Sequence, residues 1–250
     1  MWTRAELKQN AKDVLRDNYW MAFAVSLVYS LIAGIGSGSG SSVSNSTAGS
    51  SDILNQAITL TPEAVGALVI VGLLGALMGI LISFVLSFFV FGPLRVGMVR
   101  YYVESRSFPS SFGKLFYGFR RNYMNTAAAM FLTNLFIGLW SLLLIIPGVI
   151  KSLAWSQVPY ILAENPNLSG SRARAISEQM TDGQKWEIFV LQLSFLGWLL
   201  LGALLCGIGL FFVEPYIQAT QAELYARLRD RALSEGFATL EELPGIAAQA

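Results

Sequence analysis

Long apolar segments alternate with shorter polar and basic segments along almost the whole chain. A helix that crosses the hydrocarbon core of a bilayer needs about 20 mainly apolar residues, and fewer where the helix is broken at a cavity. Six segments come close to this length. We expect them to form transmembrane helices over residues 19–35, 65–91, 124–146, 148–162, 188–205 and 210–224.

Very short turns join the third segment to the fourth and the fifth to the sixth. Pro147 and Gly148 close the first turn, and residues 206–209 form the second. A basic, partly amphipathic stretch precedes each odd-numbered segment, at residues 3–17, 110–121 and 169–185. The pattern predicts an all-α, polytopic membrane protein of six transmembrane helices, arranged as three hairpins with cytoplasmic interfacial amphipathic helices. The plainer explanation of the repeat is that all membrane boundaries favour basic and aromatic residues.

Composition and charge agree with this interpretation. Hydrophobic residues make up 54% of the 250 residues, charged residues 13%, and the mean hydropathy is +0.54. Of the 17 lysines and arginines, all except Lys151 lie before the first segment, after the sixth, or in the two connections that follow the second and fourth. Because basic residues accumulate in cytoplasmic loops, both termini are predicted to be cytoplasmic.

The N-terminal residues have helical periodicity. Apolar side chains from Trp2 to Leu15 fall on one helical face, which is typical of a helix on a membrane surface. A cleaved signal peptide is the alternative, although the polar region is long and contains three acidic residues. We therefore expect one membrane domain over residues 1–250. It would comprise a cytoplasmic amphipathic helix (1–18), a six-helix region (19–226) and a helical or disordered cytoplasmic tail (227–250).

Two charged residues fall inside predicted spans. Lys151 would lie about 5 Å and Glu214 about 10 Å below the same outer boundary, at 1.5 Å per helical residue, so the two side chains could meet. A charge at the bilayer centre costs at least about 2.5–3.5 kcal/mol, so neither should face lipid. Either the pair, or a snorkelling lysine, only fastens two hairpins together, or both residues line a polar substrate-binding cavity. The cavity would draw further polar groups from Gln157, Tyr160, Tyr216, Gln218 and Gln221.

Proline and glycine positions add two weaker signals. Pro159 and Pro215 fall inside predicted spans, where a missing N–H frees a carbonyl as in the broken helices of transporters. Such kinks are also ordinary in membrane helices. Gly75 and Gly79 form a small-xxx-small pair, which is typical of close helix packing in the interior and leaves a homo-oligomer open.

The residues that carry most enzyme chemistry are missing. The chain has no histidine and a single cysteine, Cys206, so a histidine base, the usual zinc sites and an intramolecular disulfide are excluded. No phosphate-binding GxxxxGK[ST] run occurs either. We therefore expect no enzyme, no cofactor and no metal site.

Basic and aromatic residues alternate over residues 107–121. Nucleic-acid binding could be argued from this mixture, but beside two membrane spans it indicates contact with anionic lipid headgroups. The residues expected at the lipid interface are Trp2, Arg120, Arg121, Lys185 and Trp186. The uncharged Gly/Ser-rich stretch at 36–51 is typical of a flexible loop on the outer side.

Three stretches carry a family resemblance: the opening MWTRAELKQNAKDVLRDNYW, residues 158–198, and CGIGLFFVEPYIQATQAELY at 206–225. The ENP, KWE, LSFLGW and PY-x-QAT elements in them resemble an uncharacterised family of bacterial integral membrane proteins, domain of unknown function nine-seven-five, best known from Gram-positive species. The resemblance covers nearly the whole chain. It implies a multi-pass protein of the bacterial cytoplasmic membrane and implies no activity. The family more often has asparagine at the position of Glu214, so a role for that carboxylate would be particular to this chain.

Two classes of function follow from these observations. In the first, the protein binds or transports a small solute, peptide or lipid through a polar cavity between the hairpins. In the second, it is a non-catalytic membrane scaffold or accessory subunit that binds lipid or a partner through its cytoplasmic basic-aromatic face. A continuous polar path from Lys151 and Glu214 to the cytoplasmic helix ends would favour the first class.

Overall fold

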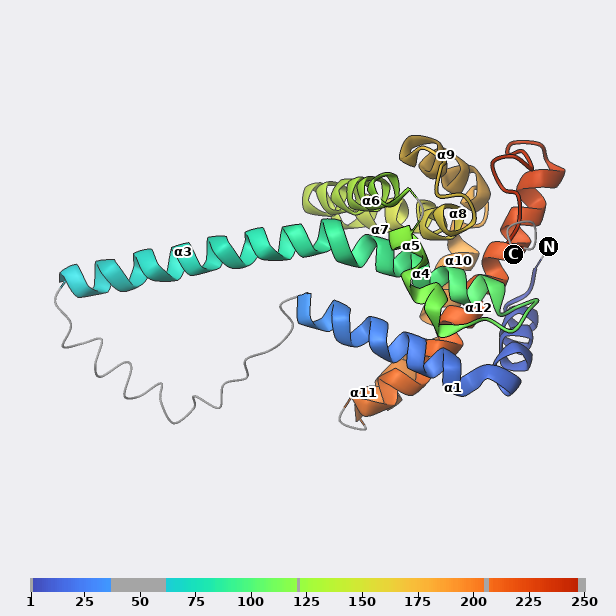
Figure 1. The fold of residues 1–250 in the computed structure, drawn as a ribbon, viewed down its shortest axis with the longest axis horizontal. Coiled ribbons are helices and arrows are strands. Elements are labelled where there is room, and N and C mark those ends of the chain that lie inside the picture. Colours follow the sequence, from blue (N-terminus) through green and yellow to red (C-terminus); the bar gives the residue numbers. More distant parts are fainter. Residues whose placement is uncertain (1, 37–61, 121, 205–206, 247–250) are drawn as a thin grey trace.

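The structure is a computed structural model that describes residues 2–36, 62–120, 122–204 and 207–246 (Figure 1). Every regular element in these ranges is helical, which confirms the all-α class for the described chain. The order is α1 (Arg4–Gly36), α3 (Pro62–Leu86), the π-helical turn η1 (Ser87–Phe91), α4 (Gly92–Glu104), the 3-10 turn η2 (Phe112–Phe116), α5 (Tyr117–Arg120), α6 (Tyr123–Leu143), α7 (Ile145–Ala154), α8 (Val158–Glu164), α9 (Gly170–Thr181), α10 (Lys185–Leu193), α11 (Leu196–Leu204) and α12 (Ile208–Ser234). Most of the predicted loop at 36–51, Arg121 and Cys206 lie outside the described residues.

Three helical stretches in the described ranges are long and apolar enough to cross a membrane: Leu68–Glu104, Tyr123–Leu143 and Lys185–Leu204. A shorter apolar helix covers Asn18–Gly34. Many of their large apolar side chains are exposed, and Leu73 in the middle of α3 is 60% exposed. An apolar surface of this extent is stable in lipid rather than in water. The molecule is therefore a helical, membrane-associated protein.

Helix α1 bends where the predicted surface helix meets the first apolar segment. Asn18 has non-helical backbone angles, φ −124° and ψ 17°. Before the bend, Leu7 and Ala11 are fully buried and Leu15 is nearly so, because α1 packs against α12. The N-terminal stretch is helical as predicted, but protein rather than lipid covers its apolar face.

The second apolar segment does not end near residue 91. Its helix continues through η1 into α4 and reaches Glu104, so Arg95 and Arg100 lie within a helix and not in the expected loop. Arg100 is 2% exposed, and its guanidinium donates to the carbonyl of Ala163 at 2.8 Å. The prediction of a loop for these two residues was wrong because protein partners, rather than water, stabilise a buried charge there.

The turn between the third and fourth segments comes earlier than predicted. Helix α6 ends at Leu143 and α7 begins at Ile145, so the extended Leu144 alone makes the turn, with φ −155° and ψ 134°. Pro147 lies in the first turn of α7, where an N–H has no partner within the helix in any case. The predicted span at 148–162 is divided between α7 and α8, and Pro159 stands in the first turn of α8 instead of inside a span.

Helix α3 has few neighbours along its apolar length. No atom of another element lies within 4 Å of a Cβ built on Gly75 or Gly79. The close packing expected at this pair is therefore not made within the described chain, and self-association through it stays a prediction. Elsewhere α6 packs against α7 and α11 against α12, so these neighbours in the sequence are also neighbours in space.

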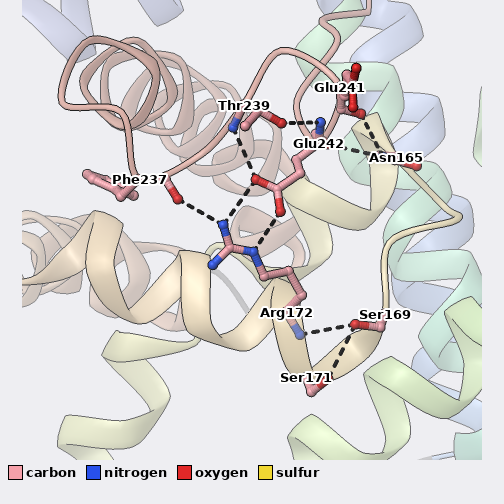
Figure 2. Close-up of polar contacts among 8 residues, drawn as sticks. All are labelled: Asn165, Ser169, Ser171, Arg172, Phe237, Thr239, Glu241 and Glu242. Atoms are coloured by element: carbon pink, nitrogen blue, oxygen red, sulfur yellow. Dashed lines mark hydrogen bonds and ion pairs between the residues drawn. The ribbon is translucent and has the colours of Figure 1, made fainter.

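The C-terminal residues fold back over the connection between α8 and α9 (Figure 2). Arg172 donates to both carboxylate oxygens of Glu242, at 2.6 and 3.1 Å, and to the carbonyl of Phe237 at 2.9 Å. The side-chain amide of Asn165 donates to the carbonyls of Glu241 and Glu242, each at 3.2 Å. We call residues 235–246 the C-terminal clasp. Where a helical or disordered tail was predicted, the structure has the last turns of α12 followed by this clasp.

Candidate functional site

Lys151 does not pair with Glu214. Its ammonium donates to Glu178 on α9 at 2.8 Å and lies 5.2 Å from the ring centre of Trp155. The hydrogen bond from Lys151 lowers the pKa of Glu178. The lysine therefore fastens α7 to α9, and the predicted meeting of Lys151 with Glu214 is not observed.

Glu214 instead lies among polar side chains from three other helices. Gln218, one turn further along α12, donates to the carboxylate at 2.6 Å. Arg95 of α4 lies within electrostatic reach of Glu214, of Tyr160 on α8 and of Tyr29 on α1. The guanidinium carbon of Arg95 lies 5.7 Å from the ring centre of Tyr29. We call these five residues the Arg95 cluster.

Local backbone features bring Arg95 to this position. The π-helical turn η1 ends one residue before α4, and such turns are rare and concentrate at functional sites. Gly92 follows the turn, and a Cβ there would lie 2.9 Å from the Cβ of Met130 on α6. Because only glycine permits this approach, α4 lies close against α6, and Arg95 is held at the space between them.

A cavity of about 260 Å³ lies beside Arg95, between α1, α4, α6 and α7. The cavity is lined by the Arg95 guanidinium and, as further polar side chains, by Tyr29, Thr133, Asn134, Ser152 and Ser156. No carboxylate of the described residues lines it. Ligand pockets in proteins usually measure about 300–1,000 Å³, so this volume suits a small solute. One cation without an acidic neighbour in the wall favours an anionic group in the cavity.

The hydroxyl groups of the wall already donate to their own helices. Thr133 donates to the carbonyl of Ala129 at 2.7 Å, and Ser152 donates to the carbonyl of Val149 at 2.8 Å. Ser156 makes the equivalent bond to Leu153 at 2.8 Å. Ser156 already accepts from Gln157 at 2.9 Å and Thr133 from Arg174 at 3.5 Å, so each of these two oxygens has one lone pair left, whereas Ser152 keeps both. The cavity can therefore bind an anionic group at Arg95 and hydrogen-bond donors at the hydroxyl groups.

Two buried amides close to the cavity have an unpaired oxygen within the described residues. Gln218 is 5% exposed and Gln157 is fully buried, and the side-chain oxygen of each accepts no hydrogen bond. An unsatisfied buried acceptor costs about 1–3 kcal/mol. The side-chain nitrogen of Gln157 donates to Ser156, which lines the cavity wall. Gln157 thus lies next to the cavity wall and Gln218 in the Arg95 cluster, and the amide oxygen of each can accept a further hydrogen bond.

Of the predicted site residues, Tyr160 joins the Arg95 cluster, and Tyr216 and Gln221 do not. Tyr160 is 3% exposed and also stacks on Tyr225, with ring centres 5.3 Å apart. Tyr216 contacts the ring of Phe195 edge-on, and the ammonium of Lys12 lies 6.0 Å from its ring centre, so it does not belong to the Arg95 cluster. Gln221 is half-buried on α12.

The predicted lipid-interface residues divide into two groups. Trp186 is 73% exposed and Arg120 is also exposed, so both can reach lipid. Trp2 donates to the side chain of Gln184 at 2.5 Å, and Lys185 donates to Asp182 at 2.9 Å. These two residues fix the turn between α9 and α10.

Sequence reasoning missed Arg95 because the residue follows the uninterrupted apolar run. A signal was present, since apolar residues continue at helical spacing from Leu94 to Tyr102. That continuation indicates a helix with one face still buried. No group of three or more metal-ligating side chains occurs among the described residues.

Residues 142–232 match the model of a family described as protein of unknown function (DUF975). The match confirms the resemblance for this segment, which extends from the end of α6 into the last turns of α12 and includes Tyr160, Glu214 and Gln218. Arg95 and α4 precede it. No curated protein and no solved structure matches the chain.

Proposed function

We propose that the protein is a multi-pass membrane protein that binds a small anionic solute beside Arg95 and moves it across the bilayer. The supporting observation is a cavity of about 260 Å³ to whose wall the described residues contribute a guanidinium and no carboxylate. A guanidinium presents donors in a planar fork that fits a carboxylate or a phosphate. The serine and threonine acceptors add a preference for solutes that also carry an ammonium or hydroxyl group, such as amino acids and hydroxy acids.

Glu214 has a balancing role in this proposal. Its electrostatic interaction with Arg95 keeps the arginine from being an isolated charge within the helices. No ion-pair contact between the two side chains is present in the described structure, where Glu214 accepts from Gln218. An anionic solute can then bind Arg95 while Glu214 keeps its amide partner. Binding and release of a solute at Arg95 therefore break no ion pair with Glu214.

The topology that accompanies this function is six transmembrane helices in three hairpins, in the cytoplasmic membrane of a bacterium. The start of α1 and the C-terminal clasp lie at the same end of the molecule, far from the free end of α3 (Figure 1). The concentration of lysine and arginine in the segments at this end supports a cytoplasmic location for it. The proposal contains no catalytic step.

A ligand screen in nanodiscs tests the binding proposal. Small amino acids, hydroxy acids and phosphate monoesters are added to the protein at millimolar concentration, and thermal unfolding is recorded. We expect at least one anionic compound to raise the unfolding temperature of the wild type. Arg95→Gln should lower the affinity for that compound roughly tenfold or more, because hydrogen bonds to a charged group contribute about 1.5–3 kcal/mol.

Two variants control for general damage. Arg95→Lys keeps the charge but loses the planar fork of donors, so it should lower the affinity for the compound less than Arg95→Gln does. Lys151→Met removes a charge that does not line the cavity and should leave the shift unchanged. A shift of equal size in Arg95→Gln and the wild type would contradict the proposal. Uptake of the stabilising compound into proteoliposomes then tests transport separately from binding.

The scaffold alternative has one observation in its favour. Trp186 is 73% exposed on a helix that begins with a basic residue, as expected of a side chain that contacts lipid or a partner. It becomes the better explanation if no compound stabilises the wild type and Arg95→Gln only lowers the unfolding temperature. The protein would then act through its surface as a non-catalytic subunit.

A further inference from the structure

A larger groove lies at the bend of α1, between α1, α11 and α12. Its volume is about 740 Å³, and it shares no lining residue with the cavity beside Arg95. Tyr216 lines this groove, which explains why the residue did not join the Arg95 cluster. The two hollows are therefore separate sites.

The polar part of the groove carries an excess of positive charge. Lys12 and Arg16 line it from the part of α1 before the bend, and both are exposed. Neither residue has an ion-pair partner within the described part of the chain. The one acidic lining residue, Asp13, accepts a hydrogen bond from Gln9 at 3.1 Å. Two cations against one carboxylate leave this part of the groove complementary to an anion.

The other part of the groove is aromatic. Trp198 of α11 is 55% exposed and Phe212 of α12 is 46% exposed, and both belong to the apolar surface of the protein. Phe212 is held in place by stacking on Phe23, with ring centres 4.9 Å apart. Tyr19, just after the bend, donates its hydroxyl to the carbonyl of Phe212 at 3.2 Å. This part of the groove is fixed by contacts between α1 and α12.

We propose that this groove binds one anionic phospholipid of the surrounding bilayer. The phosphate contacts Lys12 and Arg16, and an acyl chain lies along Trp198 and Phe212. The division of the groove into a cationic part and an aromatic part matches the division of a phospholipid into headgroup and chain. Aromatic side chains are common at the boundary between the acyl chains and the headgroups of a bilayer. This inference does not depend on the proposed function, since the lipid and the solute occupy different sites.

Fluorescence quenching by brominated lipids tests the inference. The protein is placed in nanodiscs of zwitterionic lipid that contain the same fraction of brominated phosphatidylglycerol or brominated phosphatidylcholine. Bromine on the acyl chain quenches tryptophan at contact distance. The difference between the wild type and Trp198→Phe isolates Trp198 from the other tryptophans, of which the chain has five. We expect the phosphatidylglycerol to quench Trp198 several-fold more efficiently than the phosphatidylcholine.

Charge variants then locate the headgroup. Lys12→Gln and Arg16→Gln should each reduce the preference for the anionic lipid roughly fivefold, because one basic residue near a membrane surface contributes about 1 kcal/mol to the binding of anionic lipid. The double variant should quench equally with both lipids. Arg4→Gln combined with Arg227→Gln removes the same total charge outside the groove and should keep the preference. Both control residues are exposed, and neither lines the groove.

Three outcomes would overturn the inference. Equal quenching of wild-type Trp198 by both lipids would show that the groove does not select an anion. A preference that survives in the double variant would place the headgroup elsewhere. Stabilisation of the protein in purely zwitterionic nanodiscs by soluble glycerol phosphate, lost in the double variant, would assign the groove to a free phosphate ester instead of a lipid.

Discussion

Two glutamates in this protein, Glu164 and Glu214, have opposite surroundings. Glu164 is 1% exposed and accepts from the hydroxyl of Tyr225, from the guanidinium of Arg229 at 2.7 Å and from the backbone N–H of Gly245. Among the described residues Glu214 accepts from one side-chain amide, that of Gln218, and its cationic neighbour Arg95 acts at longer range. Donors from α12 and from the C-terminal clasp surround the first carboxylate, whereas the second has little fixed support.

The difference separates a structural charge from one that can take part in binding. A carboxylate that accepts from several fixed donors, as Glu164 does, holds its surroundings in one arrangement. Arg95 faces a cavity and makes no ion-pair contact with Glu214 in the described structure, so its guanidinium can bind a ligand without breaking such a pair. The same contrast exists between Arg172, which is saturated by the clasp, and Arg95, which lines a cavity.

Glu164→Gln should have the largest effect on stability. The substitution removes the carboxylate 2.7 Å from Arg229, leaving only Asp230 at 3.9 Å, and it removes the charge that accepts from Tyr225. Breaking a buried ion pair by removing one partner costs about 3–5 kcal/mol. We expect the free energy of unfolding in detergent to fall by about 3 kcal/mol, measured by denaturant titration.

Glu214→Gln is the matched variant for this comparison. The new amide can still accept from Gln218, so we expect a loss of about 1 kcal/mol or less. Equal losses in the two variants would show that both carboxylates are structural. A greater loss of unfolding free energy in Glu214→Gln than in Glu164→Gln would identify Glu214 as the structural carboxylate.

Arg172→Gln should release the C-terminal clasp with the rest of the fold intact. The variant loses the two bonds to Glu242 and the bond to the Phe237 carbonyl. Hydrogen bonds to charged groups contribute about 1.5–3 kcal/mol, so the open population should rise roughly tenfold or more. Limited proteolysis between residues 235 and 246 measures that population. Arg120→Gln, an exposed cation away from the clasp, should leave the rate unchanged, and an unchanged rate in Arg172→Gln would contradict the role of the arginine.

Acid should open the clasp as well, and to a smaller extent. The hydrogen bond from Arg172 lowers the pKa of Glu242 in the folded protein. A group with a lowered pKa contributes stability above its unfolded-state value, about 4.3 for glutamate, and the contribution is lost as the pH falls through the folded value. We therefore expect clasp cleavage by an acid-stable protease to accelerate below about pH 4. In Glu242→Gln the rate should be high at neutral pH and should lack this component of the pH dependence.

Local sequence predicted most helices but not where they break. Helix α6 at Tyr123–Leu143 lies close to the predicted 124–146, because a continuous apolar run defines a membrane helix without reference to other segments. The break between α7 and α8 depends on tertiary contacts. Gln157 is fully buried there, and its backbone N–H donates to Ser177 of α9 at 3.2 Å. A hydropathy pattern carries no information on such a contact.

The candidate site was predicted in part for the same reason. Glu214 was recognised because a charge within an apolar run is visible in the sequence alone. Its cationic neighbour was assigned to Lys151 by depth in the bilayer, whereas the structure supplies Arg95 from a helix that continues past the apolar run. The clasp was missed because Arg172 and Glu242 are 70 residues apart, and nothing in either local segment indicates the other.

Lys151→Met should have the smallest effect. Its partner Glu178 has a side chain that is 44% exposed, and that of Lys151 is 28% exposed. Ion pairs at this exposure contribute about 0–1 kcal/mol, so the free energy of unfolding should change by less than 1 kcal/mol. Denaturant titration beside Glu178→Gln measures the pair, and the two single losses should be similar. If Lys151→Met instead abolished the stabilisation by the ligand, Lys151 would belong to the binding site. The assignment of Lys151 as a structural charge would then be wrong.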